Sequence, residues 1–401
     1  MEKATIVQDN RTLPIERQHP GHPGGHPHGK GGHPGGQPGS ASMRPTLADG
    51  VTPACRLIAW EVTRSCNLAC KHCRAEACLD PYPGELNTEQ ALALIDTFPE
   101  VGNPIIIFTG GEPLLRKDIF TLVKHAKSKG LRPVMAPNGT LVTREVVEQM
   151  IEAGIERCSL SLDGPTAEMH DTFRGVQGSF DALINAIKLF NELGMEFQIN
   201  TTVTRDNLPF FKDIFKLCED LGAKAWHIFL LVPTGRAKDI EDQVISAAEY
   251  EDVLNWFYDF QKTTDMQLKA TCAPHYHRIL RQRAKEDGTP VNFENFGLDA
   301  VSRGCLGGIG FCFISHTGQV QPCGYLDLDC GQTTETPFPK IWADSQQFAN
   351  LRNPKTYIGK CGVCEYEKVC GGCRARAETM KGNYLDEEPL CSYVPRKANA
   401  G

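Results

Sequence analysis

Three cysteines in one short stretch, Cys66, Cys70 and Cys73, have the residue type and the spacing for metal chemistry. The spacing Cys-x3-Cys-x2-Cys supplies three thiolates from one tight loop, whereas a four-iron cubane needs four ligands. The iron left without a protein ligand would be open to a small molecule, as in catalytic metal sites generally. Cys70 and Cys73 alone would also fit half of a zinc site. The stretch therefore predicts a metal centre, either an incomplete iron–sulfur cluster or a zinc site.

A second set of eight cysteines lies in the C-terminal third of the chain. They are Cys305, Cys312, Cys323, Cys361, Cys364, Cys370, Cys373 and Cys391. Two fully ligated four-iron clusters require eight ligands. A tetrahedral zinc site formed by residues 361, 364, 370 and 373 is the alternative, but it would leave the other four cysteines unexplained. We therefore expect two clusters in this region.

The chain has 17 cysteines, and it is neither short nor preceded by a signal peptide. Metal ligation in a reducing cytoplasm explains them better than a disulfide framework does. Six of them lack ligand spacing and are expected to be small buried apolar residues, at positions 55, 78, 158, 218, 272 and 330. Cys272 alone is of further interest, because of its basic neighbours.

Short apolar runs alternate with amphipathic segments from Leu57 onward, which predicts parallel strands joined by helices. The expected strands are 57–62, 104–108, 132–135, 158–162, 196–203 and 225–231. The expected helices are 88–97, 118–129, 144–153, 180–193 and 209–221. Six such units are fewer than the eight of a closed barrel. The fold class is therefore α/β, with an open, partial (β/α)6 barrel whose site lies at the carboxyl ends of the strands.

Polar residues follow several of these strands. The glycines of Gly110-Gly111-Glu112 let a ligand approach the backbone, and the carboxylate can accept a hydrogen bond from an ammonium group. Asn138 follows the third strand, and Ser161 lies in the fourth. Such residues also serve as helix caps and turn formers.

A basic segment follows the last expected strand. Its cations and histidines suit a substrate with several carboxylates, because arginine binds carboxylates bidentately. A histidine could also ligate an iron carried by the substrate. The alternative is a solvated basic helix. The candidate substrate-binding residues are Arg236, Lys269, His275, His277 and Arg278.

The bulk composition excludes some partners. A net charge of -7 argues against nucleic acid, and the chain has neither a membrane-spanning apolar run nor a signal peptide, so a cytoplasmic protein is expected. Residues 1–50 form a Gly/Pro/His-rich tail that we expect to be disordered. The expected domains are a barrel over 51–265, a linker or substrate-binding segment over 266–300 and a cluster domain over 301–401.

The cysteine stretch at 66–73, the Gly-Gly-Glu-Pro run at 110–113 and the motifs at 137–139 and 159–164 resemble the radical S-adenosylmethionine (SAM) enzymes. In that family the open iron binds the amino acid end of SAM, and one electron from the cluster yields a 5′-deoxyadenosyl radical. The resemblance implies SAM contacts from Gly110, Gly111, Glu112, Asn138, Ser161 and Arg174. Among these, Glu112 would meet the methionine amine, Ser161 the ribose and Arg174 the methionine carboxylate.

The C-terminal cysteines resemble the SPASM extension of radical SAM enzymes, with x2 where x3 is common before Cys373. The resemblance implies one auxiliary cluster on residues 305, 312, 323 and 373 and a second on residues 361, 364, 370 and 391. Cys312 could be replaced by His316 or by an open iron. The total is three [4Fe-4S] clusters with SAM.

From about residue 50 to 395 the chain is similar to the haem b synthases of the siroheme-dependent haem pathway. The motifs at 135–140, 229–236, 269–275 and 310–316 carry this likeness. It implies conversion of Fe-coproporphyrin III into haem b by oxidative loss of two propionate carboxyl groups, with two SAM consumed. It also implies an electron donor such as flavodoxin or ferredoxin, and an unidentified acceptor. The alternatives are a related tetrapyrrole enzyme (didecarboxysiroheme-forming or for the haem of nitrite reductase), a peptide-modifying SPASM maturase and a zinc-stabilised scaffold.

Overall fold

The computed structural model describes residues 51–396, and the predicted tail over 1–50 lies outside these described residues. Helices and strands alternate along the chain as expected from the sequence. The strands that match the six predicted ones are β1 Leu57–Glu61, β2 Ile105–Thr109, β3 Arg132–Met135, β4 Arg157–Ser161, β5 Glu196–Val203 and β6 Ala225–Leu230. The helices that match the five predicted ones are α1 Thr88–Thr97, α2 Ile119–Ser128, α3 Arg144–Ala153, α5 Ser179–Leu193 and α6 Phe211–Asp220. The predicted α/β fold is confirmed.

The sheet extends beyond the six predicted strands on both sides. In residues 51–396 it has ten strands, in the order β10-β9-β8-β1-β2-β3-β4-β5-β6-β7, and its edges are β10 and β7. Strand β7 (Gln267–Thr271) pairs in parallel with β6, and β8 (Phe311–Ile314) pairs in parallel with β1. Strands β9 (Gln319–Gln321) and β10 (Gly331–Gln332) follow as antiparallel additions. The sheet is therefore open, with eight parallel strands instead of six.

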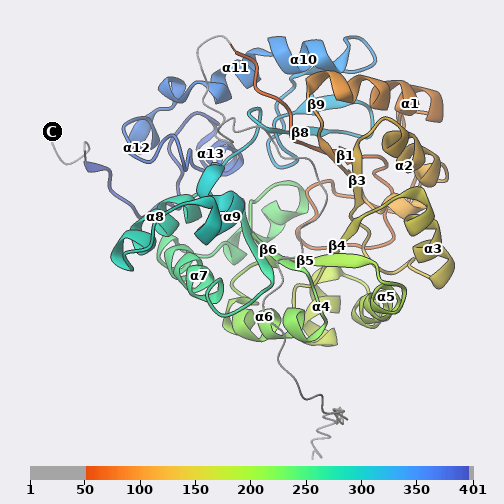
Figure 1. Cartoon of the computed structure of the whole chain (residues 1–401), viewed down its shortest axis with the longest axis horizontal. Helices are drawn as coiled ribbons and strands as arrows, with labels where there is room; N and C mark the ends of the chain where they lie inside the picture. The colour runs from red at the N-terminus through yellow and green to blue at the C-terminus, as the bar shows by residue number, and fades with distance from the viewer. Residues whose placement is uncertain (1–50, 397–401) are drawn as a thin grey trace, which may run out of the picture. The chain divides into compact units, whose positions relative to one another are not determined.

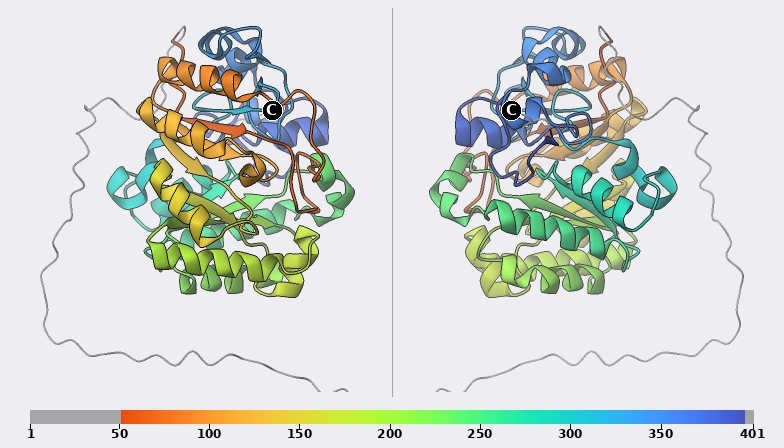
Figure 2. Two further views of the ribbon diagram at one scale, coloured as in Figure 1. Left: turned by 90° about the vertical axis from the view of Figure 1, so that its right-hand side faces the viewer. Right: turned by 90° about the vertical axis from the view of Figure 1, so that its left-hand side faces the viewer.

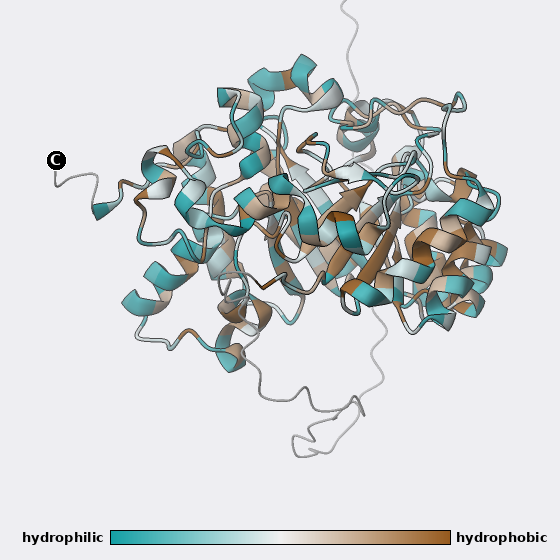
Figure 3. Ribbon diagram, turned by 90° about the horizontal axis from the view of Figure 1, so that it is seen from above, coloured by the Kyte–Doolittle hydropathy of each residue, from teal (hydrophilic) through white to brown (hydrophobic). Residues whose placement is uncertain are grey.

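Helices lie along the outer side of the curved sheet, as Figure 1 shows. Local signals set their ends: Asn87 and Gln90 form a capping box at the start of α1, and Gly154 ends α3 with a left-handed backbone (φ 91°). The core between helices and sheet contains Trp60, Phe98 and Phe108, none of them exposed. Figure 3 shows the resulting pattern, with apolar strands inside and polar residues on the outer helices.

The C-terminal third contributes to the same sheet. Helices α7 (Ala247–Phe260), α8 (Tyr276–Glu286) and α9 (Phe293–Val301) precede β8. Helices α10 (Phe338–Asp344), α11 (Gln346–Arg352), α12 (Gly359–Gly362) and α13 (Arg374–Lys381) follow β10. Helix α10 packs against α1, and Figure 2 shows this segment (blue) beside the first helix (orange). Strands β8 and β9 form an antiparallel hairpin.

The expected domain limits at 265/266 and 300/301 stay predictions. The segment over 266–300 is an ordered part of the fold, because it contains β7, α8 and most of α9. In the described part of the chain, no helix is long and apolar enough to cross a membrane.

Candidate active site and cluster sites

The stretch that connects β1 to α1 (residues 62–87, here called the cysteine loop) carries Cys66, Cys70 and Cys73 at the carboxyl end of the first strand. Burial raises the pKa of Cys66 to about 11 and also raises that of Cys70. Buried thiols of this kind ionise readily only beside positive charge, which iron supplies. The loop is thus placed and sheltered as the family resemblance requires.

Backbone contacts from two later segments hold the cysteine loop in position. The amides of Ala69 and Lys71 donate hydrogen bonds to the carbonyls of Arg174 (3.2 Å) and Phe173 (3.0 Å). The guanidinium of Arg236 donates to the carbonyls of Cys70 (2.9 Å) and Ala77 (2.8 Å). The sequence suggested Arg236 as a substrate contact, but these two bonds go to the loop. Arg236 is therefore a positioning residue for the cysteines in this structure.

Gly110 and Gly111 lie where the loop after β2 meets the cysteine loop. A Cβ atom at Gly110 would lie 2.2 Å from the Thr63 carbonyl oxygen, and one at Gly111 would lie 2.3 Å from that of Ser65. Both glycines are required by this close backbone packing. The sequence pointed to close approach by a ligand, whereas here the nearest neighbour is the cysteine loop itself.

The side chain of Glu112 is fully buried at the same junction. Its carboxylate accepts hydrogen bonds from the amides of Leu114 (3.0 Å) and Asn138 (2.6 Å). Burial nevertheless raises the pKa of Glu112 to about 7. A buried carboxylate with no cationic partner is suited to receive an amino group from a ligand. This fits the predicted place of the SAM amine.

The side chains of Asn138 and Arg174 each lie near a sulfur of the cysteine loop. The amide nitrogen of Asn138 donates to the Asn67 side chain (2.7 Å) and lies 4.0 Å from the Cys66 sulfur. The buried guanidinium of Arg174 lies 3.6 Å from the Cys70 sulfur and is paired with the carboxylate of Asp163. Arg174 thus lies beside the cluster cysteines. Its carboxylate partner in this structure is Asp163, and its predicted contact with the SAM carboxylate stays a prediction.

Sequence reasoning did not use His72, which lies within the cysteine loop. Its ring stacks on Phe173, with centroids 4.4 Å apart and 6° between planes. Its Nδ1 is buried without a hydrogen-bond partner, and burial lowers its pKa well below the ordinary value. A flat, neutral imidazole beside the cluster cysteines can stack against a planar ligand. The sequence signal that could have identified His72 is its place between Cys70 and Cys73, as the one ring-bearing side chain there.

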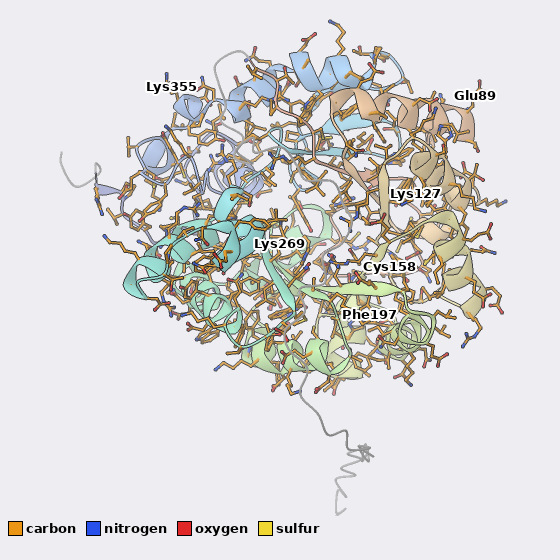
Figure 4. The ribbon with its side chains drawn as sticks, in the orientation of Figure 1. Glu89, Lys127, Cys158, Phe197, Lys269 and Lys355 are labelled. Carbon is orange, nitrogen blue, oxygen red and sulfur yellow. The ribbon has the colours of Figure 1, made fainter. Side chains whose placement is uncertain are left out.

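The inner face of the sheet is marked by alternate strand residues that are only half-buried. On β4 to β7 these residues are mostly polar: Ser159, Ser161, Gln198, Asn200, Thr202, His227 and Lys269. Ser161 thus shares this face, and its predicted contact with the SAM ribose stays a prediction. Figure 4 places Lys269 toward the middle of the view, whereas Glu89 and Lys355 lie at its margin.

A hydrogen-bonded chain crosses β5 and β6 on this inner face. The amide nitrogen of Gln198 donates to the Asn200 side chain (3.0 Å) and to Nδ1 of His227 (3.0 Å). Burial lowers the pKa of His227 to about 3, so its ring is neutral. A neutral ring that accepts at Nδ1 carries its proton on Nε2. Because His227 also pairs in register with Lys269 on β7, this face offers an N–H donor beside a cation.

The second predicted auxiliary group is assembled in the structure. One pocket is lined by Cys361, Cys364, Cys370 and Cys391, together with His275, Arg278 and Glu388. The Cys361 sulfur accepts hydrogen bonds from the Arg374 guanidinium (3.5 Å) and the Glu388 amide (3.4 Å). Four thiols facing one pocket, with N–H donors to sulfur, fit a four-iron cluster.

The first predicted auxiliary group is only partly assembled. Cys323 and Cys373 share one side-chain cluster, and Cys305 acts electrostatically on Cys323. Cys272 belongs to the same cluster. The neighbouring Cys272 thiol lowers the pKa of Cys373 to about 7. The alternative zinc site needs residues 361, 364, 370 and 373 around one ion. It is disfavoured, because Cys373 packs with Cys272 and Cys323, whereas the other three cysteines line the pocket.

Cys312 lies elsewhere, and this corrects its expected place beside those cysteines. It is on β8, fully buried, opposite Ile58 of β1. Burial and the neighbouring thiols of Cys55 and Cys330 raise the pKa of Cys312 well above its usual value. The alternative ligand His316 is likewise committed, since its Nδ1 lies 2.8 Å from the carboxylate of Glu61. Both residues thus have other neighbours in this structure, and their predicted role as cluster ligands stays a prediction. Among the described residues, no three His, Cys, Asp or Glu side chains are close enough to hold a single metal ion.

The predicted substrate-binding residues have several different neighbours in the structure. His275 and Arg278 line the pocket of the second auxiliary group, and Arg278 is paired with Glu251 (2.5 Å) and stacks over Tyr393. His277 is buried, and its pKa is lowered to about 3 by burial, with Arg281 and Lys269 adding to the effect. Lys269 is on the inner face of the sheet and acts electrostatically on His277. The shared role of these five residues in substrate binding stays a prediction.

Comparison with known proteins places this architecture. Residues 60–218 match the radical SAM superfamily, and residues 305–373 match an iron–sulfur cluster-binding domain of the SPASM type. An AdoMet-dependent heme synthase of Oleidesulfovibrio alaskensis is 66% identical over 384 residues, which cover 94% of this chain and 99% of that protein. The chain belongs to the AdoMet-dependent haem synthase family of radical SAM enzymes. Iron–sulfur clusters and SAM are therefore its cofactors.

The chain is also similar to a more distant curated protein and to solved structures. A protein of Methanosarcina barkeri named Fe-coproporphyrin III synthase is 32% identical and covers 84% of this chain and 87% of its own length. Among solved structures, SuiB of Streptococcus suis bound to S-adenosylmethionine has a TM-score of 0.65 with 17% identity, covering 85% of this chain and 78% of that one. This structural likeness supports the fold alone.

Proposed function

We propose that this haem synthase converts Fe-coproporphyrin III into haem b by turning two propionate side chains into vinyl groups. The observation that carries the proposal is the polar inner face of the sheet, where Gln198 holds His227 as an Nε2–H donor beside Lys269. A donor and a cation side by side suit a carboxylate. A haem synthase needs a substrate whose carboxylates are bound and then lost.

The chemistry balances with SAM as the co-substrate. When bound, the cluster and SAM would supply a 5′-deoxyadenosyl radical. The substrate propionate loses one hydrogen atom from its β-carbon, which must lie within about 3–3.5 Å of the attacking carbon. It then releases carbon dioxide and one electron as the carbon–carbon double bond forms. Two such rounds consume two SAM and give two vinyl groups.

The residues of the chain would prepare these events by holding the reactants in place. Cys66, Cys70 and Cys73 would hold the SAM cluster, and the buried carboxylate of Glu112 would hold the SAM amino group. Arg174 would act beside Cys70, where Asp163 fixes its orientation. No side chain needs to act as a general base, because the carboxylate leaves as carbon dioxide without proton transfer.

We further propose three [4Fe-4S] clusters, of which the two auxiliary ones are the exit for the electron. An external reductant such as flavodoxin or ferredoxin would reduce the SAM cluster, and an unidentified acceptor would receive the electron released by the substrate. The C-terminal cysteine groups support this division, because neither of them belongs to the cysteine loop.

Anaerobic incubation with dithionite, SAM and candidate porphyrins, followed by mass spectrometry, tests the proposal. Fe-coproporphyrin III should be converted into a product with two vinyl groups, through an intermediate with one. Conversion of a siroheme derivative, or of a peptide, in place of Fe-coproporphyrin III would favour the related tetrapyrrole enzymes or the SPASM maturases. Removal of Lys269 (Lys269→Met) should weaken porphyrin binding without changing iron content.

A further inference from the structure

Cys272 lies directly after β7, outside both of the segments that match the cluster-binding families. Its side chain packs in one cluster with those of Cys323 and Cys373. Backbone contacts bring the segment that carries Cys305 close to these three cysteines. The amide of Cys305 donates to the carbonyl of Cys370 (3.2 Å), and Gly304 packs so tightly on Pro274 that an added Cβ would lie 2.4 Å from it.

The backbone of Cys272 has a conformation that a cysteine rarely adopts. Its φ is 55°, and within residues 51–396 only Glu76 is another non-glycine residue with a positive φ. Such a conformation persists only where the surroundings enforce it, and it is often found at functional sites.

Buried polar groups clamp the peptide that carries this conformation. The Cys272 carbonyl accepts hydrogen bonds from the Tyr250 hydroxyl (2.8 Å) and the Arg376 guanidinium (3.1 Å). Arg376 is held in turn by Glu388 (3.2 Å), and neither side chain is exposed. Arg376 follows Cys373 by one helical turn, so the clamp fixes Cys272 relative to another cysteine of the group.

We propose that Cys272 is the fourth thiolate ligand of the first auxiliary cluster, with Cys305, Cys323 and Cys373, and that Cys312 is not a ligand. This rests on the proposed presence of that cluster and not on the identity of the porphyrin. With four protein ligands the cluster has no open iron, so it can pass electrons but cannot bind the substrate through iron. Ligation by Cys272 would also attach the cluster to the end of β7, the strand that carries Lys269 on the inner face of the sheet.

The test compares Cys272→Ala and Cys272→Ser with the control Cys312→Ala in otherwise intact, anaerobically reconstituted protein. The readouts are iron and sulfide content and the electron paramagnetic resonance spectrum of the reduced clusters, with and without added cyanide. Both Cys272 variants should change one auxiliary spectrum. Cys272→Ala should lose about one to four of about twelve irons or show a new signal that shifts with cyanide. Cys312→Ala should match the wild type.

The opposite pattern would overturn the proposal. That pattern is a wild-type spectrum and iron content in Cys272→Ala, or a lost cluster in Cys312→Ala with normal circular dichroism. Cys272→Ser covers the case in which the alanine variant fails to fold, since a serine oxygen can ligate iron with a shifted spectrum. A wild-type spectrum for the serine variant would also contradict the assignment. None of these readouts requires turnover, so failure of the proposed reaction would leave the result interpretable.

Discussion

Replacement of Glu112 by glutamine should remove a pH dependence from SAM binding. Burial holds the pKa of this carboxyl at about 7 in place of 4.5, which opposes ionisation by about 3 kcal/mol at 1.36 kcal/mol per pKa unit. Below pH 7 the SAM-free site is mostly neutral, and an amino group then meets a protonated acid. With a pKa of about 7, the ionised fraction falls about tenfold between pH 8 and pH 6.

The assay is the dissociation constant of SAM for cluster-loaded protein, measured anaerobically at pH 6 and pH 8. The ratio of the Glu112→Gln constant to the wild-type constant should be about ten times smaller at pH 6 than at pH 8. Titration of SAM itself is common to both proteins and cancels in this ratio. Glu89→Gln, in the exposed first turn of α1, is the matched control and should bind like the wild type. A ratio that is the same at both pH values would refute the role given to Glu112.

Other changes have equally definite outcomes. Alanine at all three cluster cysteines of the cysteine loop should abolish SAM cleavage yet leave about eight irons; loss of all iron would contradict the separate cluster assignments. Cys364→Ala with Cys370→Ala should keep 5′-deoxyadenosine formation but yield little haem, whereas a ratio near two deoxyadenosines per haem would make that cluster structural. His227→Phe should weaken porphyrin binding about tenfold through one lost hydrogen bond, and equal affinity in a binding titration would exclude the contact. Deletion of residues 1–42 should leave decarboxylation nearly unchanged, because their composition offers little apolar surface, and a severalfold loss in cluster-loaded protein would show otherwise.

Local patterns predicted the parts of the fold that are local. The runs that became β1 to β6 are apolar or alternate between apolar and polar residues, and turn residues bound them, so each could be recognised alone. Strand β7 was not recognised, because in Gln267–Thr271 only Leu268 is buried. Strand β8 pairs with β1 across about 250 residues of chain, and such a pairing leaves no trace in either segment.

The parts of the site that follow from sequence motifs were predictable. The parts that depend on how distant segments pack together were not. The cysteines of the second auxiliary group face one pocket, as the resemblance to the SPASM extension implied. Cys312 fitted the count of eight but has its side chain on the buried face of β8. Cys272 has no spacing signal at all, since only the end of β7 brings it to Cys373. Arg236 was grouped with His275 because it is a cation at the end of the sixth expected strand, whereas in the structure its guanidinium binds the cysteine loop and His275 lines the pocket of the second auxiliary group.

The measurement that tests the central claim most directly uses Fe-coproporphyrin III deuterated at the β-carbons of its propionates. The account predicts that 5′-deoxyadenosine formed during turnover carries one deuterium and that vinyl products appear in step with it. Unlabelled deoxyadenosine accompanied by haem formation would contradict the account, because the hydrogen atom would then come from elsewhere.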